Sequence, residues 1–216
     1  MYIITQGVPF EEYKDKIYRV KSPAEEEKYP KAGYQRHERE YKITCGHKDY
    51  IVICHEYRKD EKGHEPVVII PDFLMRGRRY PVEVYLYAIE IYSGNPEKGQ
   101  RKAAEETRKR FDLATFAHTT LGRALKALVC NLNKAAGTNA DREESGVEAE
   151  PTEDGGGRKG NTKAPGFPTV QATRPLRERA AQFLDGNATH SDLQMVIAAY
   201  RKKARDWFLE HRRLLL

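Results

Sequence analysis

Residues 100–132 read QRKAAEETRKRFDLATFAHTTLGRALKALVCNL, and the predicted fold is built around them. A basic helix is expected over 100–110, a turn over 111–117 and a second, amphipathic helix from about His118. The apolar positions that recur at helical spacing in the second helix are Leu121, Leu125, Leu128 and Leu132. This is the layout of a helix-turn-helix, whose second helix enters the major groove of DNA. A plain helical hairpin has the same periodicity and is the alternative interpretation.

The second helix carries a polar face opposite these leucines. Thr119 and Thr120 are candidate N-caps, because a threonine hydroxyl can accept a bond from a free amide of the first turn. The residues expected to approach base edges or phosphates are Thr119, Thr120, Arg123 and Lys126. The residues expected to clamp phosphates from the first helix are Arg101, Lys102, Lys109 and Arg110. Base contacts give specificity, whereas phosphate clamps give affinity that depends on salt.

The distribution of charge favours the same segment. The whole chain carries a formal charge of +6, but residues 141–157 hold seven carboxylates and one arginine, which leaves +12 for the rest. Residues 98–134 hold nine bases and three acids. A basic segment of this kind is the electrostatic footprint of phosphate contact, although a run of lysine and arginine is more often a solvated helix face.

Composition indicates a cytoplasmic protein. Of the 216 residues, 39% are hydrophobic and 32% are charged, and no apolar run approaches the roughly 18 residues of a membrane span. The N-terminal residues show no signal peptide. Three cysteines are an odd and sparse set, which argues for a reducing compartment.

Other segments predict strands and further helices. Period-two alternation predicts a β-hairpin over 41–54 with a turn at Gly46, and Val67 to Ile70 predict a third strand that Pro71 ends. Residues 80–92 predict a helix that would complete a three-helix unit. Residues 135–165 have few apolar side chains, so a disordered linker is expected there.

Two helices are expected at the end of the chain, over 175–184 and 191–211. The second has an apolar stripe, formed by Leu193, Val196, Ile197, Tyr200, Ala204, Trp207 and Phe208. Its basic residues Arg201, Lys202, Lys203 and Arg205 are expected largely outside the stripe. Three roles stay open for the stripe: packing on the preceding helix, homodimer formation through this C-terminal helix, or a second nucleic-acid surface.

Three short phrases resemble a bacterial family of unknown function that is found near mobile elements. They are Ile70-Pro71-Asp72-Phe73-Leu74, Arg79-Tyr80 and Thr120-Leu121-Gly122-Arg123-Ala124-Leu125-Lys126. Members of that family combine an N-terminal zinc ribbon with a helix-turn-helix. The resemblance covers residues 33–128 and implies DNA binding akin to the N-terminal regions of transposases.

The zinc ligands of that family are absent at the matching place. Residues 59–64 read KDEKGH, and an ammonium cannot replace a thiolate on zinc. We therefore expect a metal-free hairpin, held by Tyr41, Ile43, Ile51 and Ile53. A rearranged site would have to pool Cys45, His47, Cys54, His55 and His64. Their spacing is poor for one metal, because neighbouring residues on a strand point to opposite faces.

The sequence shows no nucleophile with its base and no phosphate-binding glycine loop in the required order, so we expect a non-enzymatic protein without a cofactor. The predicted fold is α+β. Its predicted parts are a degenerate ribbon-like β region (1–79), a helix-turn-helix domain (80–134), a disordered acidic linker (135–168) and a C-terminal helical hairpin (169–216). The expected partner is double-stranded DNA. The alternative is a protein-interaction adaptor on a helix-turn-helix scaffold that no longer binds DNA.

Overall fold

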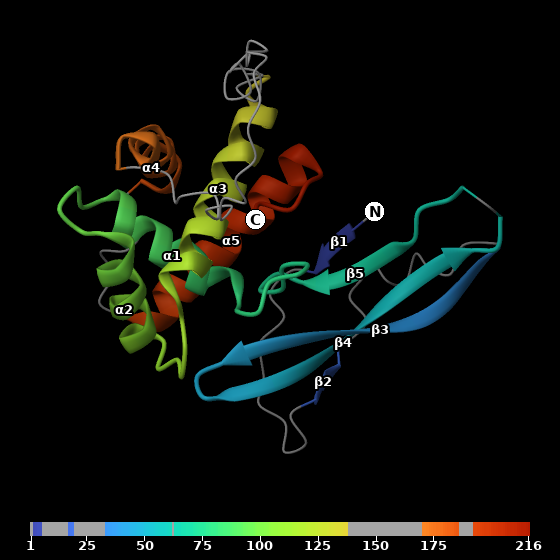
Figure 1. The fold of residues 1–216 in the computed structure, drawn as a ribbon. Helices are drawn as coiled ribbons and strands as arrows, with labels where there is room; N and C mark the ends of the chain where they lie inside the picture. The colour runs from blue at the N-terminus through green and yellow to red at the C-terminus, as the bar shows by residue number, and fades with distance from the viewer. Residues whose placement is uncertain (1, 6–16, 20–32, 62, 138–169, 186–191) are drawn as a thin grey trace, which may run out of the picture.

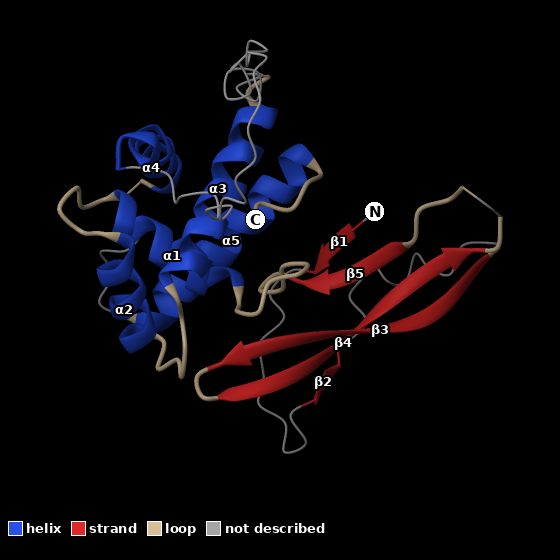
Figure 2. Ribbon diagram, viewed as in Figure 1, coloured by secondary structure: helices blue, strands red, loops and turns tan. Residues whose placement is uncertain are grey.

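The computed structural model describes residues 2–5, 17–19, 33–61, 63–137, 170–185 and 192–216. The strands are β1 (Tyr2–Thr5), β2 (Ile17–Arg19), β3 (Tyr34–Cys45), β4 (Lys48–Lys59) and β5 (Val67–Pro71). The helices are α1 (Val82–Ser93), α2 (Gln100–Arg110), α3 (His118–Ala135), α4 (Val170–Leu184) and α5 (Leu193–His211). The helices gather beside the sheet, which makes the fold α+β as predicted (Figures 1 and 2).

The sheet combines antiparallel and parallel pairing. β3 and β4 form a long hairpin with Cys45 opposite Lys48, and β4 also pairs antiparallel with β5. β1 runs parallel to β5, and β2 runs parallel to β4. Gly46 has a φ of 58°, a left-handed value that glycine adopts without strain in the hairpin turn. The predicted hairpin and third strand are confirmed, whereas β1 and β2 were not predicted.

One face of the hairpin supplies the core of the sheet. Its buried residues are Ile43, Tyr50, Val52 and Cys54. Tyr41 packs against this cluster. Ile51 and Ile53 belong to the opposite face, because side chains alternate along a strand. Ile43 and Tyr41 therefore hold the hairpin as expected and Ile53 is also buried, whereas Ile51 is only partly buried.

Helices α1, α2 and α3 pack against one another. Ala103 and Ala104 of α2 are buried, and these small side chains let α2 lie close to its neighbours. The buried face of α3 contains Leu121, Leu125, Leu128 and Leu132, also as predicted. Complete burial of one leucine contributes about 1.5–3 kcal/mol, so this face fixes α3 firmly in the group.

The first turn of α3 differs from the prediction. Helix α3 begins at His118, but its N-cap residue is Ala117, which makes no side-chain capping bond. The amide of Thr120 donates to the Ala117 carbonyl oxygen at 3.0 Å. Thr119 and Thr120 already lie inside the helix, and a capping side chain must come before the first helical residue. The prediction that they are N-caps is therefore wrong.

Helix α4 starts earlier than predicted. It begins at Val170, and Pro175 lies inside it rather than at its start. Proline has no amide hydrogen, so the helix loses one backbone bond there but continues. Helix α5 follows the prediction more closely. Its N-cap is Asp192, whose carboxylate accepts a bond from the Gln194 amide at 2.8 Å.

Most of the apolar stripe on α5 is buried by contacts within the chain. Helix α5 packs mainly against α1, and Trp207 also contacts Phe183 of α4 edge to face, with 5.6 Å between ring centres. Trp207 belongs to the helical core, whereas the next residue, Phe208, belongs to the sheet core. Helix α5 therefore joins the two cores, and five of the seven stripe residues are buried within the chain.

Arg201 was expected to lie outside the apolar stripe, but its side chain is mostly buried against α1. Its guanidinium is 3.1 Å from the Glu83 carboxylate of α1, and the two side chains are 17% and 4% exposed. Burial raises the pKa of the Glu83 carboxyl, while the charge and hydrogen bond of Arg201 lower it. Lys202 is exposed, and Lys203 and Arg205 are partly buried.

The C-terminal helices share the core of the first three. Helix α4 contacts both α1 and α3, and Ala180 and Leu184 of α4 belong to the same cluster as the leucines of α3. The predicted linker, from residue 138 onward, falls outside the described residues. Within the residues that the structure describes, none of the helices is long and apolar enough to cross a membrane.

Candidate nucleic-acid interface

Helix α2 exposes its basic side chains away from the core. Arg101, Lys102 and Lys109 are exposed as predicted, and Arg108, which was not predicted as a clamp, is exposed too. Lys109 is 2.8 Å from Glu105 in a surface ion pair. Within the described parts of the chain, Arg101, Lys102 and Arg108 form no salt bridge. Three cations of α2 therefore remain available to an anionic partner.

Arg110 is placed differently from the other predicted clamps. It is partly buried at the end of α2. Burial raises the pKa of Tyr87 on α1, and the nearby charge of Arg110 lowers it. The next residue, Phe111, packs its ring against Tyr87 with 5.4 Å between centres. Arg110 thus lies where α2 packs on α1 and is less accessible than a phosphate clamp should be.

Helix α3 exposes Arg123 and Lys126 opposite its buried leucines. Thr119 and Thr120 lie in the first turn and are partly buried. Residues 120, 123 and 126 are spaced by three, so they follow one side of the helix. The 18 residues of α3 include no carboxylate, so no acidic group of the helix itself neutralises this side.

The first turn of α2 approaches α3 closely. A Cβ atom placed on Gly122 would lie 3.1 Å from Oε1 of Gln100. The two contacting residues are each followed in the chain by an exposed arginine, Arg123 and Arg101. This contact brings the predicted base-reading helix and the predicted clamping helix together where both carry charge.

The connection between α2 and α3 is long. It contains the seven residues 111–117, whereas a compact helix-turn-helix has about three or four. Phe116 is buried and packs edge to face on Tyr80, with 5.2 Å between ring centres. The Tyr80 hydroxyl donates to the carbonyl oxygen of Thr115. Contacts from outside the helix pair therefore hold this connection in place.

A third group of basic residues, not predicted as part of the site, lies in the loop that leads into α1. Arg76, Arg78 and Arg79 lie between β5 and α1, beside the connection that Tyr80 holds. Arg76 and Arg79 are exposed, and Arg78 is partly buried. Three arginines within four residues were a visible signal, but the sequence does not show that this loop lies beside α2 and α3.

The five residues considered for a rearranged metal site have other surroundings. Burial raises the pKa of the Cys54 thiol to about 12, which opposes the thiolate form that zinc needs. His47 is 3.2 Å from Asp112, and His64 is 3.1 Å from Glu61. In the described ranges, no three potential ligands cluster closely enough to hold a metal ion.

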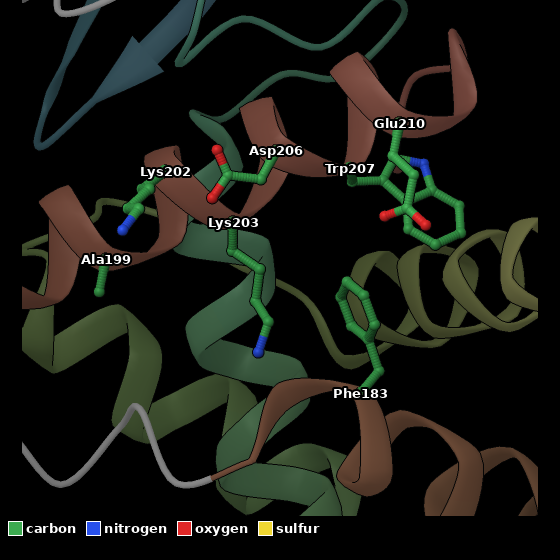
Figure 3. Close-up of a pocket in the computed structure, with 7 residues that line it drawn as sticks. All are labelled: Phe183, Ala199, Lys202, Lys203, Asp206, Trp207 and Glu210. Atoms are coloured by element: carbon green, nitrogen blue, oxygen red, sulfur yellow. The ribbon is translucent and has the colours of Figure 1, made fainter.

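An open pocket of about 370 Å³ lies between α4 and α5 (Figure 3). Its lining residues are Phe183, Ala199, Lys202, Lys203, Asp206, Trp207 and Glu210. Burial lowers the pKa of Lys203, whose ammonium donates to the Leu184 carbonyl oxygen at 2.9 Å. Two lysines and two carboxylates share the rim, so the pocket offers no uniform charge to a ligand, and its best-placed cation already holds the end of α4.

Comparison with known proteins returned no relative for this α+β chain. No known protein family, no curated protein and no solved structure matches it. The resemblance of the three short phrases to a mobile-element-associated family remains a prediction.

Proposed function

We propose that this chain is a non-enzymatic protein that binds double-stranded DNA through α2 and α3. The observation that carries the proposal is the set of exposed cations without a salt bridge to any described residue. These residues are Arg101, Lys102, Arg108, Arg123 and Lys126. Duplex DNA presents about one negative charge per 1.7 Å of its axis, so clustered cations on two adjacent helices suit several phosphates at once.

Helix α3 is the proposed groove-binding element. Its 18 residues make a rod of about 27 Å, and the major groove admits one α-helix. Arg123 can form two parallel hydrogen bonds to a guanine edge, and Lys126 can reach a base or a phosphate. The clamps on α2 that fit this role best are Arg101 and Lys102, because Lys109 is already paired and Arg110 is partly buried.

An adaptor role is the second candidate, and one observation favours it. Met195 and Leu209 of α5 are large apolar side chains that are 54% and 53% exposed. They are 14 residues apart, which places them about 40° from each other around the helix. Such a pair could contact another protein. The two side chains are far apart along α5, however, while the cations of the DNA proposal lie on two helices that contact each other.

An electrophoretic shift with a mixed-sequence duplex, at low and moderate salt, tests the DNA proposal. The double variant Arg123→Ala/Lys126→Ala should bind at least tenfold more weakly, since a base contact is worth about 1–3 kcal/mol. Lys202→Ala/Arg213→Ala is the matched control, because it removes two exposed cations elsewhere and should leave binding unchanged. Absence of any retardation of the wild-type complex at low salt would contradict the proposal.

A further inference from the structure

Three segments that are distant in the chain meet beside α2 and α3. They are the tip of the β3–β4 hairpin, the loop 76–80 and the connection 111–117. Three hydrogen bonds join them: Thr44 amide to Arg79 carbonyl at 2.7 Å, Ala114 amide to Gly46 carbonyl at 3.4 Å, and Tyr80 hydroxyl to Thr115 carbonyl. Each segment is bonded to both of the others, so the three form one junction.

The loop 76–80 is held at both ends. Met75 and Tyr80 flank the arginines and are buried in the helical core. The hydroxyl of Tyr85 accepts bonds from the amides of Arg79 and Tyr80, at 3.2 Å and 3.3 Å. A backbone fixed in this way loses little freedom when its side chains bind a partner, which lowers the entropic cost of binding.

The side chains of this junction present positive charge to solvent. Arg76 is exposed and, among the described residues, makes no salt bridge. Arg79 is also exposed, and its Nε donates to the Thr44 hydroxyl at 3.0 Å. Lys42 is exposed two residues before Thr44, on the same face of β3.

Two carboxylates of the junction oppose this charge, and both already have partners. Asp49 accepts a bond from the Thr44 hydroxyl at 2.6 Å and lies 3.8 Å from an Arg79 nitrogen. Asp112 is 3.2 Å from a ring nitrogen of His47. The positive side chains therefore outnumber the acids, and neither acid contacts Arg76 or Lys42.

We infer that Arg76 and Lys42, positioned by the bonds between Arg79 and Thr44, form a second phosphate-binding element, which grips the DNA backbone beside the site of α2 and α3. This inference rests on the proposed function, since it assigns a further contact to the same duplex. The junction ties the element to the connection between α2 and α3. Binding of α3 in a groove therefore brings these cations to the adjacent backbone without a rearrangement of the chain.

The dependence of DNA affinity on salt tests this inference. A fluorescent duplex of about 30 base pairs is titrated with the full chain at several NaCl concentrations. The slope of log K against log salt is negative, and each lost phosphate contact reduces its magnitude by about 0.9. Arg76→Ala and Lys42→Ala should each lower it by that amount, and the double variant by about 1.8. The matched control is Arg36→Ala, an exposed arginine at the far end of β3.

The outcomes separate this inference from the proposed function. Reduced slopes for the Arg76 and Lys42 variants, with an unchanged slope for Arg36→Ala, support it. If the wild-type chain binds DNA but the Arg76 and Lys42 variants have the same slope as Arg36→Ala, the inference is overturned. DNA binding by α2 and α3 is then left intact. If the wild-type chain shows no binding at the lowest salt, both are overturned. Far-ultraviolet circular dichroism of each variant confirms that these surface substitutions leave the fold unchanged.

Discussion

Thr44 and Arg79 are joined by two hydrogen bonds that run in opposite directions. The Thr44 amide donates to the Arg79 carbonyl oxygen at 2.7 Å, and Arg79 Nε donates to the Thr44 hydroxyl at 3.0 Å. Thr44 is buried next to the hairpin turn, and Arg79 lies in the loop that leads into α1. The pair therefore fixes the end of the sheet to the beginning of the helical group.

Thr44→Val should weaken this joint. Valine keeps the shape of threonine and the backbone bond, but it loses the side-chain bonds to Arg79 and Asp49. We expect the free energy of unfolding to fall by about 1–2 kcal/mol, since each of the two lost bonds has a usual net value near 1 kcal/mol. Urea unfolding measures the change. Lys42→Ala, on the same face of β3, is the control, and an equal effect of the two substitutions would show that these bonds do not stabilise the fold.

The buried pair of Arg201 and Glu83 should control how stability depends on pH. Arg201→Met removes one partner and leaves a buried carboxylate, which costs about 3–5 kcal/mol at neutral pH. Lys202→Met changes the exposed neighbour and should cost little. Chemical unfolding at a series of pH values gives both quantities.

The direction of the pH effect follows from the raised pKa of Glu83. Burial makes the folded state bind this proton more tightly than the unfolded state. The resulting stability is fully present below the ordinary pKa of glutamate and is lost as the pH rises through the folded pKa. Arg201 opposes this rise, so Arg201→Met should destabilise the protein more at pH 7 than near pH 4. Two results would rule out this explanation. One is that Arg201→Met loses the same free energy of unfolding at pH 4 and pH 7. The other is that adding Glu83→Gln to Arg201→Met does not reduce the dependence of its stability on pH.

Cys54 should be inert in the folded protein. Its thiol is buried, and its pKa of about 12 leaves roughly one molecule in ten thousand as thiolate at pH 8. Cys45 and Cys130 are partly exposed. Iodoacetamide at pH 8, followed by peptide mass spectrometry, should label these two residues and spare Cys54. Unfolding in urea should make all three react, and rapid labelling of Cys54 without urea would contradict its burial.

Gly122→Ala tests how tightly α2 meets α3. Alanine is favoured over glycine inside a helix by about 1 kcal/mol. The new methyl group would lie 3.1 Å from the Gln100 amide oxygen, at the end of a side chain that can rotate away. We therefore expect thermal stability to rise slightly or to stay unchanged. If Gly122→Ala instead lowers thermal stability clearly, and adding Gln100→Ala restores it, the Gln100 side chain is fixed against α3.

Local patterns predicted much of this structure. The bounds of α2, the start of α3 and the buried leucines of α3 followed from helical spacing, which involves residues three or four apart. The hairpin of β3 and β4 followed from alternation and one short turn. The capping role of Thr119 and Thr120 was wrong, because helix propensity and capping preference do not fix the first residue of a helix to within one or two positions.

The rest of the candidate site required contacts between distant residues. Tyr80 holds Thr115 across 35 positions of the chain, and Arg201 meets Glu83 across 118. No local rule selects such partners, since they depend on how complete elements pack. For the same reason, the sequence showed three arginines at 76–79 but did not show what lies beside them.

The sequence alone determined that the chain has a basic segment on two amphipathic helices, a hairpin and an apolar stripe near its end. Each of these features is a repeat or a cluster of neighbouring residues, so the order of residues is enough to define it. The tertiary structure decided that α5 buries its stripe between the helical and sheet cores, and that the loop 76–80 adjoins α2 and α3. Those relations follow from the burial of apolar surface, which depends on the whole fold rather than on any one segment.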